Sequence, residues 1–133
     1  VYEKISSDNG FTRREISDEE ITDRCILALI NEGADILSEG VAQRAADIDV
    51  VYINGYGFPI WRGGPMHHAN AMGLDVVVDK LNKYYEITSN NAYKPSDLLI
   101  KLAKEGGKLA DSPSDENRKE KLNFAKSSVA GNF

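Results

Sequence analysis

Residues 47–65 read DIDVVYINGYGFPIWRGGP, and this stretch decides how the rest of the chain is arranged. Four glycines and two prolines crowd into it, which neither a plain helix nor a plain strand requires. Glycine permits a left-handed backbone or a close approach by another segment, whereas proline fixes its own φ and extends the residue before it. We therefore predict a specifically shaped turn, to which Phe58, Ile60 and Trp61 add apolar surface.

Length and composition are those of one ordinary globular domain. The chain has 133 residues, 41% hydrophobic and 28% charged, which suffices for one core without disulfides or metal. Its 21 acidic and 16 basic residues leave a formal charge of -5, which argues against nucleic acid or an anionic membrane as partner. The longest apolar run, residues 25–30, is too short to span a bilayer. The first residue is Val1, which suggests a piece of a longer polypeptide.

The clearest helix start is at Ser17. Ser17-Asp-Glu-Glu20 is a capping box, and Ile16 can pack against Ile21 as a hydrophobic staple. Gly40 suits the left-handed position after a helix end. We therefore predict a helix over residues 17–39.

This first helix is apolar on several sides. The expected main face carries Ile21, Cys25, Ala28, Leu29 and Ile36, and further apolar residues, Ile26, Leu27 and Ile30, fall on other faces. We predict that the helix is the buried centre of the domain or part of an interface. Cys25 is expected to be a small buried hydrophobe in a reducing compartment.

Four shorter helices are predicted after it. Residues 47–54 have both strand and helix character, and we choose a helix capped by Asp47 and ended by Gly55. Pro65 suits the first position of a helix that ends near Gly73. A one-sided apolar stripe marks a helix over residues 74–86, and four apolar residues before Gly106 mark the last helix, Leu98, Leu99, Leu102 and Ala103.

The expected organisation has three parts. Residues 1–15 are a linker with little structure of its own, residues 16–106 form the helical domain, and residues 107–133 form a flexible tail or a loosely docked helix. The fold class is all-α, with about five helices, and the glycine-rich loop is expected to fold against the first helix.

The sequence contains no catalytic constellation. His67 and His68 are neighbours, and on a helix they point too far apart to chelate one metal ion. The GYG and RGG glycines lack the lysine and hydroxyl of a phosphate-binding loop. Arg24 and Glu32 are more readily explained as structural ions than as catalysts. Asp23 and Asp49 have capping or solvent roles as their simplest explanation.

A family resemblance rests on the order of Arg24, Asn31-Glu32, Glu39-Gly40, Asp49, Gly55-Tyr-Gly-Phe-Pro59, Gly64-Pro65 and Gly73-Leu-Asp75. Over about residues 17–104 this order resembles the C-terminal helical domain of the 3-hydroxyacyl-CoA dehydrogenases. The phrases RCILALINEGADILSEGVAQRAADIDVV and GYGFPIWRGGPMHHA look like the second of two tandem copies in bifunctional fatty-acid oxidation proteins. These proteins join an enoyl-CoA hydratase to the dehydrogenase.

The resemblance implies a helical domain like the C-terminal one of 6-phosphogluconate dehydrogenase. It also implies an NAD-dependent parent enzyme whose catalytic and dinucleotide-binding residues lie in an upstream Rossmann domain. This chain would then hold no catalytic, cofactor or metal site, and would be inactive alone. The substrate-cleft or structural residues carried over are Asp23, Arg24, Glu32, Asp49, Gly55, Gly57, Phe58, Pro59, Gly64 and Pro65.

Partners are implied in the same way. They are the Rossmann domain and the first helical copy of the parent, with acyl-CoA as the parent's substrate. The isolated chain is expected to self-associate through the face that the first copy would cover. A cytoplasmic, bacterial-type parent is expected rather than a peroxisomal one, because no targeting tripeptide ends the chain. The alternative function is a free-standing helical interaction module without an enzymatic parent.

Three positions depart from the family pattern. Asp23 stands where an asparagine faces the substrate in single-copy relatives, and Asn70 stands where an aspartate is usual. Residues 60–63 lengthen the run that follows Phe58 and Pro59.

Overall fold

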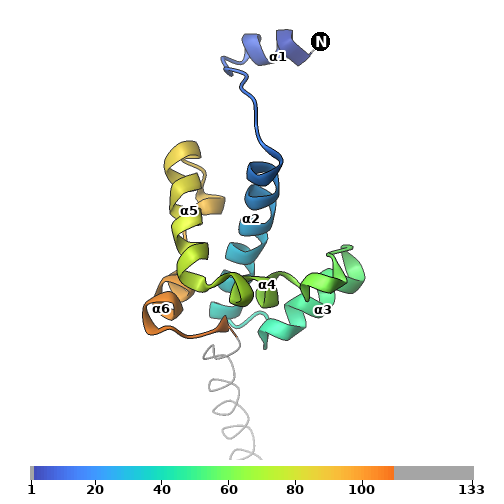
Figure 1. The fold of residues 1–133 in the computed structure, drawn as a ribbon, viewed down its shortest axis with the longest axis vertical. Coiled ribbons are helices and arrows are strands. Elements are labelled where there is room, and N and C mark those ends of the chain that lie inside the picture. Colours follow the sequence, from blue (N-terminus) through green and yellow to red (C-terminus); the bar gives the residue numbers. More distant parts are fainter. Residues whose placement is uncertain (1, 110–133) are drawn as a thin grey trace, which may run out of the picture.

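The computed structural model describes residues 2–109, all of whose regular elements are helical (Figure 1). The elements are α1 (Tyr2–Asp8), α2 (Asp18–Ser38), α3 (Ala45–Gly55), η1 (Ile60–Arg62), α4 (Pro65–Met72), α5 (Leu74–Thr88), η2 (Asn91–Tyr93) and α6 (Asp97–Glu105). The 3-10 turns are η1 and η2. No strand occurs in this part of the chain, so the predicted all-α class is confirmed and the five predicted helices correspond to α2–α6.

Helix α2 is the longest element, and the others gather along it. Its lower half packs against α3, α4 and α6, and α5 runs beside its upper half (Figure 1). Helix α4 lies between α2, α3 and α5 and contacts all three. The core therefore sits where α4 crosses α2.

The ends of α2 follow the predicted signals in part. The Ser17 hydroxyl accepts a hydrogen bond from the Glu20 amide at 3.2 Å, and Gly40 after the helix has φ of 73°. The Glu20 carboxylate does not return to Ser17 but pairs with Arg14. Half of the capping box is therefore present, and its acidic residue connects the helix to the preceding segment.

The buried face of α2 differs from the predicted one. Buried side chains are Leu27, Ile30, Asn31, Ala34 and Leu37, whereas Ile21 and Cys25 are exposed. Helices α3, α4 and α6 pack on the C-terminal half, and the N-terminal half projects beyond them with α5 beside it (Figure 1). The prediction of a buried Cys25 is thus wrong, although the helix is central as expected.

Close contact between α2 and α4 depends on a glycine. Gly33 lies within α2, where a Cβ would clash with the Met66 Cε atom. Met66 is fully buried and belongs to the core cluster. A hydrogen in place of a side chain at position 33 therefore lets the two helices approach closely enough to fill the core.

A buried amide joins α2 to the segment before α6. The Asn31 Nδ2 group donates to the carbonyl oxygens of Ala92 and Lys94 at 3.2 and 2.8 Å, and its Oδ1 accepts from the Ser96 amide at 2.8 Å. Asn31 is only 4% exposed, so these bonds lie away from competing water. One side chain satisfies three backbone groups of η2 and its continuation.

Other boundaries also differ from the predictions. Residues 2–8 form α1, which buries no residue, where little structure was predicted. Helix α3 begins at Ala45 with Arg44 as its N-cap residue, because Arg44 is extended and its guanidinium pairs with Asp47 in the first turn. The predicted Asp47 cap is therefore wrong.

The glycine-rich loop was predicted to fold against the first helix. Its 3-10 turn η1 packs instead mainly on α4. After α6, Leu109 is fully buried in the core and its amide donates to Asn70 Oδ1 at 2.9 Å. The rest of the predicted tail, residues 110–133, lies outside the described residues.

Asn31→Ala should lower the free energy of unfolding by about 2–4 kcal/mol, because one buried and two part-buried backbone groups lose their partner. The exposed α5 residue Asn82 offers the matched control, and Asn82→Ala should change stability by no more than about 0.5 kcal/mol. Urea denaturation followed by circular dichroism measures both. Equal effects of the two substitutions would contradict the structural role of Asn31.

Candidate functional site

The carboxylate of Asp49 in α3 caps the N-terminus of α4. Its Oδ1 accepts a hydrogen bond from the Met66 amide at 2.7 Å, and its Oδ2 accepts one from the His67 amide at 3.1 Å. The first turn of a helix leaves such amides without intrahelical partners and carries a partial positive charge. Asp49 therefore ties α3 to α4 through two charge-assisted bonds.

The sequence around Pro65 creates the binding place for the Asp49 carboxylate. Pro65 has no amide hydrogen and starts α4, so Met66 and His67 supply the first free donors. Gly64 has φ of 96°, and a Cβ there would clash with the Asp49 carboxylate. Burial raises the pKa of the Asp49 carboxyl, and its two amide donors oppose that rise. The glycine-proline pair thus shapes a binding place for this one side chain.

Asp23 connects α2 to α5. Lys80 Nζ donates to its two carboxylate oxygens at 3.0 and 2.7 Å, and the Tyr84 hydroxyl donates to Oδ2 at 3.4 Å. Burial raises the pKa of Tyr84, and the negative charge of Asp23 raises it further. The Asp23 carboxylate is therefore engaged within the domain.

Arg24 and Glu32 have different surroundings although both lie on α2. The Arg24 guanidinium pairs with Glu20 at 3.5 Å, donates to the Tyr93 hydroxyl at 3.5 Å and lies 5.7 Å from that ring's centroid. These contacts agree with the prediction that Arg24 is a structural ion. Glu32 is exposed, and the structure does not bring it near the other candidate residues.

The glycine-rich loop has a buried anchor and an exposed tip. Phe58 is buried, and its amide donates to the Tyr52 carbonyl at 3.0 Å. Gly55 ends α3, Gly57 has φ of 69°, and Pro59 precedes η1. These residues shape the turn and carry no group for chemistry.

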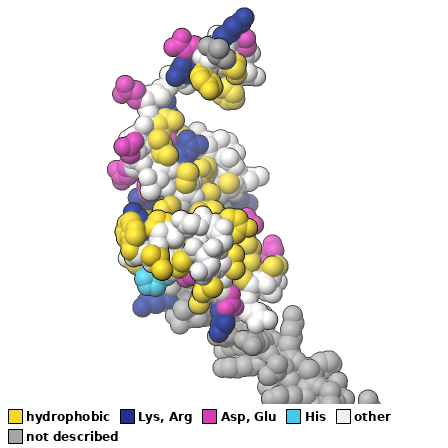
Figure 2. Space-filling view, turned by 90° about the vertical axis from the view of Figure 1, so that its right-hand side faces the viewer, with side chains coloured by type: hydrophobic (Ala, Val, Ile, Leu, Met, Phe, Trp, Pro, Cys, Tyr) yellow, Lys and Arg dark blue, Asp and Glu magenta, His cyan; other side chains and the backbone are white. Residues whose placement is uncertain are grey.

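An apolar patch covers α3 and this loop, on the face shown in Figure 2. We define it by five side chains that are between 54% and 77% exposed, Val50, Val51, Tyr56, Ile60 and Trp61. Monomers rarely leave large contiguous apolar patches bare, and tryptophan and tyrosine are enriched at binding hot spots. The patch is therefore a candidate contact surface for another protein segment.

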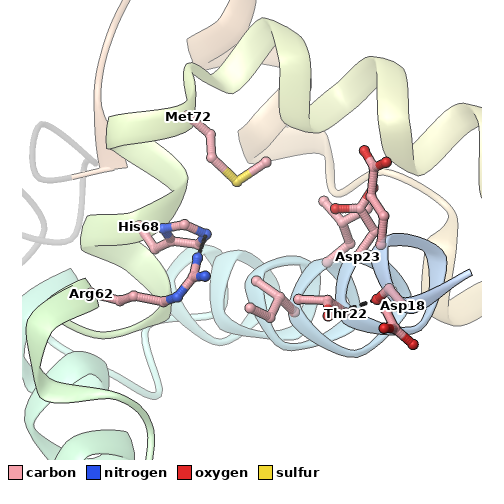
Figure 3. A pocket seen from close by; sticks show the side chains of 9 residues that line it. Asp18, Thr22, Asp23, Arg62, His68 and Met72 are labelled. Carbon is pink, nitrogen blue, oxygen red and sulfur yellow. Dashed lines mark hydrogen bonds between the residues drawn. The ribbon is translucent and has the colours of Figure 1, made fainter.

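A pocket of about 410 Å³ lies between α2 and α4, with Arg62 of η1 at one end (Figure 3). Arg62 and His68 lie together on one side, and Asp18 and Asp23 come from α2 on the other. Arg62 Nη1 lies 3.1 Å from His68 Nε2, which accepts because a guanidinium can only donate. Burial lowers the pKa of His68, and the positive charge of Arg62 lowers it further.

Two kinds of feature, a metal-binding cluster and a membrane span, are not found in the described part of the chain. Residues 2–109 hold no group of three His, Cys, Asp or Glu side chains arranged for a metal ion. None of the helices in this range combines the length and apolarity needed to cross a bilayer.

The structure brings together some predicted site residues and adds others. Asp49, Gly64 and Pro65 form one unit, whereas Asp23 and Arg24 lie on α2 away from it. Lys80, Arg62 and His68 were not among the predicted site residues. Lys80 meets Asp23 across 57 residues of sequence, a separation that no local pattern indicates.

Comparison with known proteins gives one family. The profile described as the C-terminal domain of 3-hydroxyacyl-CoA dehydrogenase matches residues 21–113. The human peroxisomal bifunctional enzyme is 46% identical over 111 residues, covering 77% of this chain, and the zebrafish one is 44% identical over 107 residues, covering 80%. The alpha subunit of the fatty acid oxidation complex of Vibrio vulnificus is 34% identical over 96 residues, covering 72%. This chain spans about 15% of the length of these relatives, and 14% of the bacterial one.

Asp49→Ala should destabilise the domain by about 1–3 kcal/mol, because two amides at the start of α4 lose their acceptor. Asp47→Ala on the same helix removes an exposed ion pair with Arg44 and should cost about 1 kcal/mol or less. Thermal and urea unfolding compare the two. A smaller loss at position 49 than at position 47 would contradict the capping role.

His68 should make stability depend on pH. Its pKa in the folded chain lies below the ordinary value of 6.5, so the unfolded chain binds this proton more readily. The stability that neutral His68 contributes is present above pH 6.5 and is lost as pH falls through the lowered pKa. His68→Gln should therefore flatten the decline below pH 6.5 in urea unfolding. An unchanged slope in His68→Gln would refute this assignment.

Proposed function

We propose a supporting function for this chain, which belongs to the family of 3-hydroxyacyl-CoA dehydrogenase C-terminal domains. It braces an NAD-dependent dehydrogenase of fatty-acid oxidation and does not itself perform the chemistry. The observation that carries the proposal is the use of its charged side chains. Asp49 ties α3 to α4, and Asp23 ties α2 to α5. These groups hold helices in place rather than converging on one reacting centre, as expected of a supporting domain.

The partners proposed are other parts of the same parent chain. Relatives that contain this domain are about six to seven times its length, since the aligned part is 15% of them. We infer that an upstream Rossmann domain supplies the catalytic residues and binds NAD, and that acyl-CoA binds between that domain and helical domains. The apolar patch on α3 and the loop would then pack against the first helical copy, in the manner of a dimer interface.

The helical domain of the proposal includes residues 16–106, with Leu109 docked into the same core. Asp23 would serve in positioning helices rather than in contacting substrate, because Lys80 and Tyr84 occupy its carboxylate. The free-standing interaction module remains the second candidate, since the apolar patch would serve it equally. The sequence upstream of Val1 separates the two, because only a dehydrogenase has a dinucleotide-binding segment there.

The compartment follows the type of parent. The cited relatives from human and zebrafish are 46% and 44% identical and are named as peroxisomal, whereas the cited bacterial subunit is 34% identical. The higher identity favours a parent of the peroxisomal bifunctional type. The cytoplasmic, bacterial-type parent expected from sequence is the alternative.

The isolated chain should neither bind NAD nor oxidise a 3-hydroxyacyl-CoA. Hydride transfer needs a nicotinamide held against the substrate, and the sequence has no glycine fingerprint to hold one. Calorimetric titration with NAD should give no saturable heat at micromolar concentration, with a complete dehydrogenase as positive control. Saturable heat from this chain would contradict the supporting role.

The isolated chain should also self-associate through the apolar patch, because its proposed partner is missing. Light scattering over a concentration series should show a dimer that weakens in Ile60→Ser/Trp61→Ser. Ile87→Ser is the matched control, because Ile87 is 58% exposed on α5, outside the patch. A strict monomer up to about 1 mM, an affinity limit of roughly 4 kcal/mol, would rule out the pairing role.

A further inference from the structure

The pocket between α2 and α4 carries charges that the domain does not neutralise. Arg62 lies at one end and takes part in no ion pair among residues 2–109, and within this range its guanidinium hydrogen-bonds only to His68. His68 accepts from the guanidinium and supplies no negative charge. The Trp61 ring lies 4.4 Å from the guanidinium carbon and holds that side chain from another side. A partly buried guanidinium is thus fixed at the pocket wall with its charge uncompensated.

The far end of the pocket is acidic. Asp18 and Glu19 line it from the first turn of α2, and neither takes part in an ion pair within the described residues. Asp23 lies at the same end, but Lys80 neutralises it. The Thr22 hydroxyl donates a hydrogen bond to the backbone carbonyl of Asp18 at 2.8 Å, so it does not occupy the Asp18 carboxylate. Negative charge is therefore available opposite Arg62 (Figure 3).

Between the two charged ends the lining is apolar. Ile26 and Leu27 of α2 and Met72 of α4 contribute this part of the surface. The volume of about 410 Å³ is within the range of small-ligand sites, and such sites combine apolar walls with a few polar groups that orient the ligand. A ligand that matches this order has an anion at one end, a cation at the other and a hydrocarbon spacer.

We propose that this pocket binds a small zwitterion of the amino-carboxylate class. The ligand carboxylate pairs with Arg62, where a planar guanidinium offers two parallel donors. The ligand ammonium group pairs with Asp18 or Glu19, and the methylene spacer lies on Ile26, Leu27 and Met72. A simple anion pairs with Arg62 but leaves the acidic end of the pocket unpaired. A simple cation pairs with the acidic end but leaves Arg62 unpaired, so neither satisfies both ends.

The first experiment compares three probes of equal chain length on the 133-residue chain. 6-Aminohexanoate carries both charges, hexanoate only the anion and hexylamine only the cation. Amide chemical shifts and the fluorescence of Trp61, the single tryptophan, report occupancy. We expect a dissociation constant on the order of a millimolar for 6-aminohexanoate. Each single-ended probe should bind about two- to fivefold more weakly, the value of one partly exposed ion pair.

Variants then assign the two ends. With Arg62→Gln, 6-aminohexanoate should bind no better than hexylamine does to the unsubstituted chain. With Asp18→Asn/Glu19→Gln, it should bind no better than hexanoate. Matched controls are Arg44→Gln on α3, and Asp79→Asn/Glu86→Gln on the exposed side of α5, and both should leave binding unchanged. Circular dichroism confirms that each variant is folded.

Three results would overturn the proposal. Equal affinity for hexanoate and 6-aminohexanoate would show a site for anions alone. Equal losses in the control variants would show that the probes respond to net charge rather than to this pocket. The absence of any saturable shift up to about 50 mM, well above the dissociation constant expected of so small a ligand, would show that the pocket does not bind ligands of this class. None of these results bears on NAD binding, so the NAD titration tests the proposed function separately.

Discussion

The hydrogen bonds from α4 to the Asp49 carboxylate are the constraint on which the rest of the domain depends. Helix α4 contacts α2, α3 and α5, so its position sets theirs. It begins inside the protein, where Pro65 and Met66 are buried and unpaired amides would be costly. Asp49 supplies both acceptors, and Gly64 provides the space for its side chain. The glycine-proline sequence and Asp49, fifteen residues before Gly64, thus together fix the position of α4 relative to α3.

Local signals in the sequence were sufficient for most of the fold. The Ser17 cap, the Pro65 start and the one-sided stripe of α5 each act within a few residues, so helix positions could be predicted. The buried face of α2 could not be predicted, because apolar residues occur all around this helix. Only the packing of the neighbouring helices determines which of these residues are buried. Leu27 and Ile30 belong to the core cluster, whereas Cys25 is exposed. Helix α1 was missed because it buries nothing that periodicity would reveal.

The candidate site was predictable where it resembled a known pattern and not where it depends on distant contacts. Asp49, Gly64 and Pro65 were identified by resemblance, and their geometry explains why these three residue types occur together. Asp23 was identified too, but its partner Lys80 lies on α5 and only the folded chain brings them together. Asn31 was part of the recognised order but was not singled out. Its three bonds run to residues more than sixty positions away.

Two surfaces of the domain meet at neighbouring residues. Trp61 belongs to the apolar patch, and its ring lies against the guanidinium of Arg62, which lines the pocket. A segment that covers the patch would bury this ring and thereby restrict the orientations open to Arg62. Binding at either place must then alter the free energy of binding at the other by the same amount, since coupling between two sites is reciprocal. The sign depends on whether the covered ring holds Arg62 toward the pocket or draws it away. Residues 60–63 therefore place the apolar patch and the pocket under one local constraint.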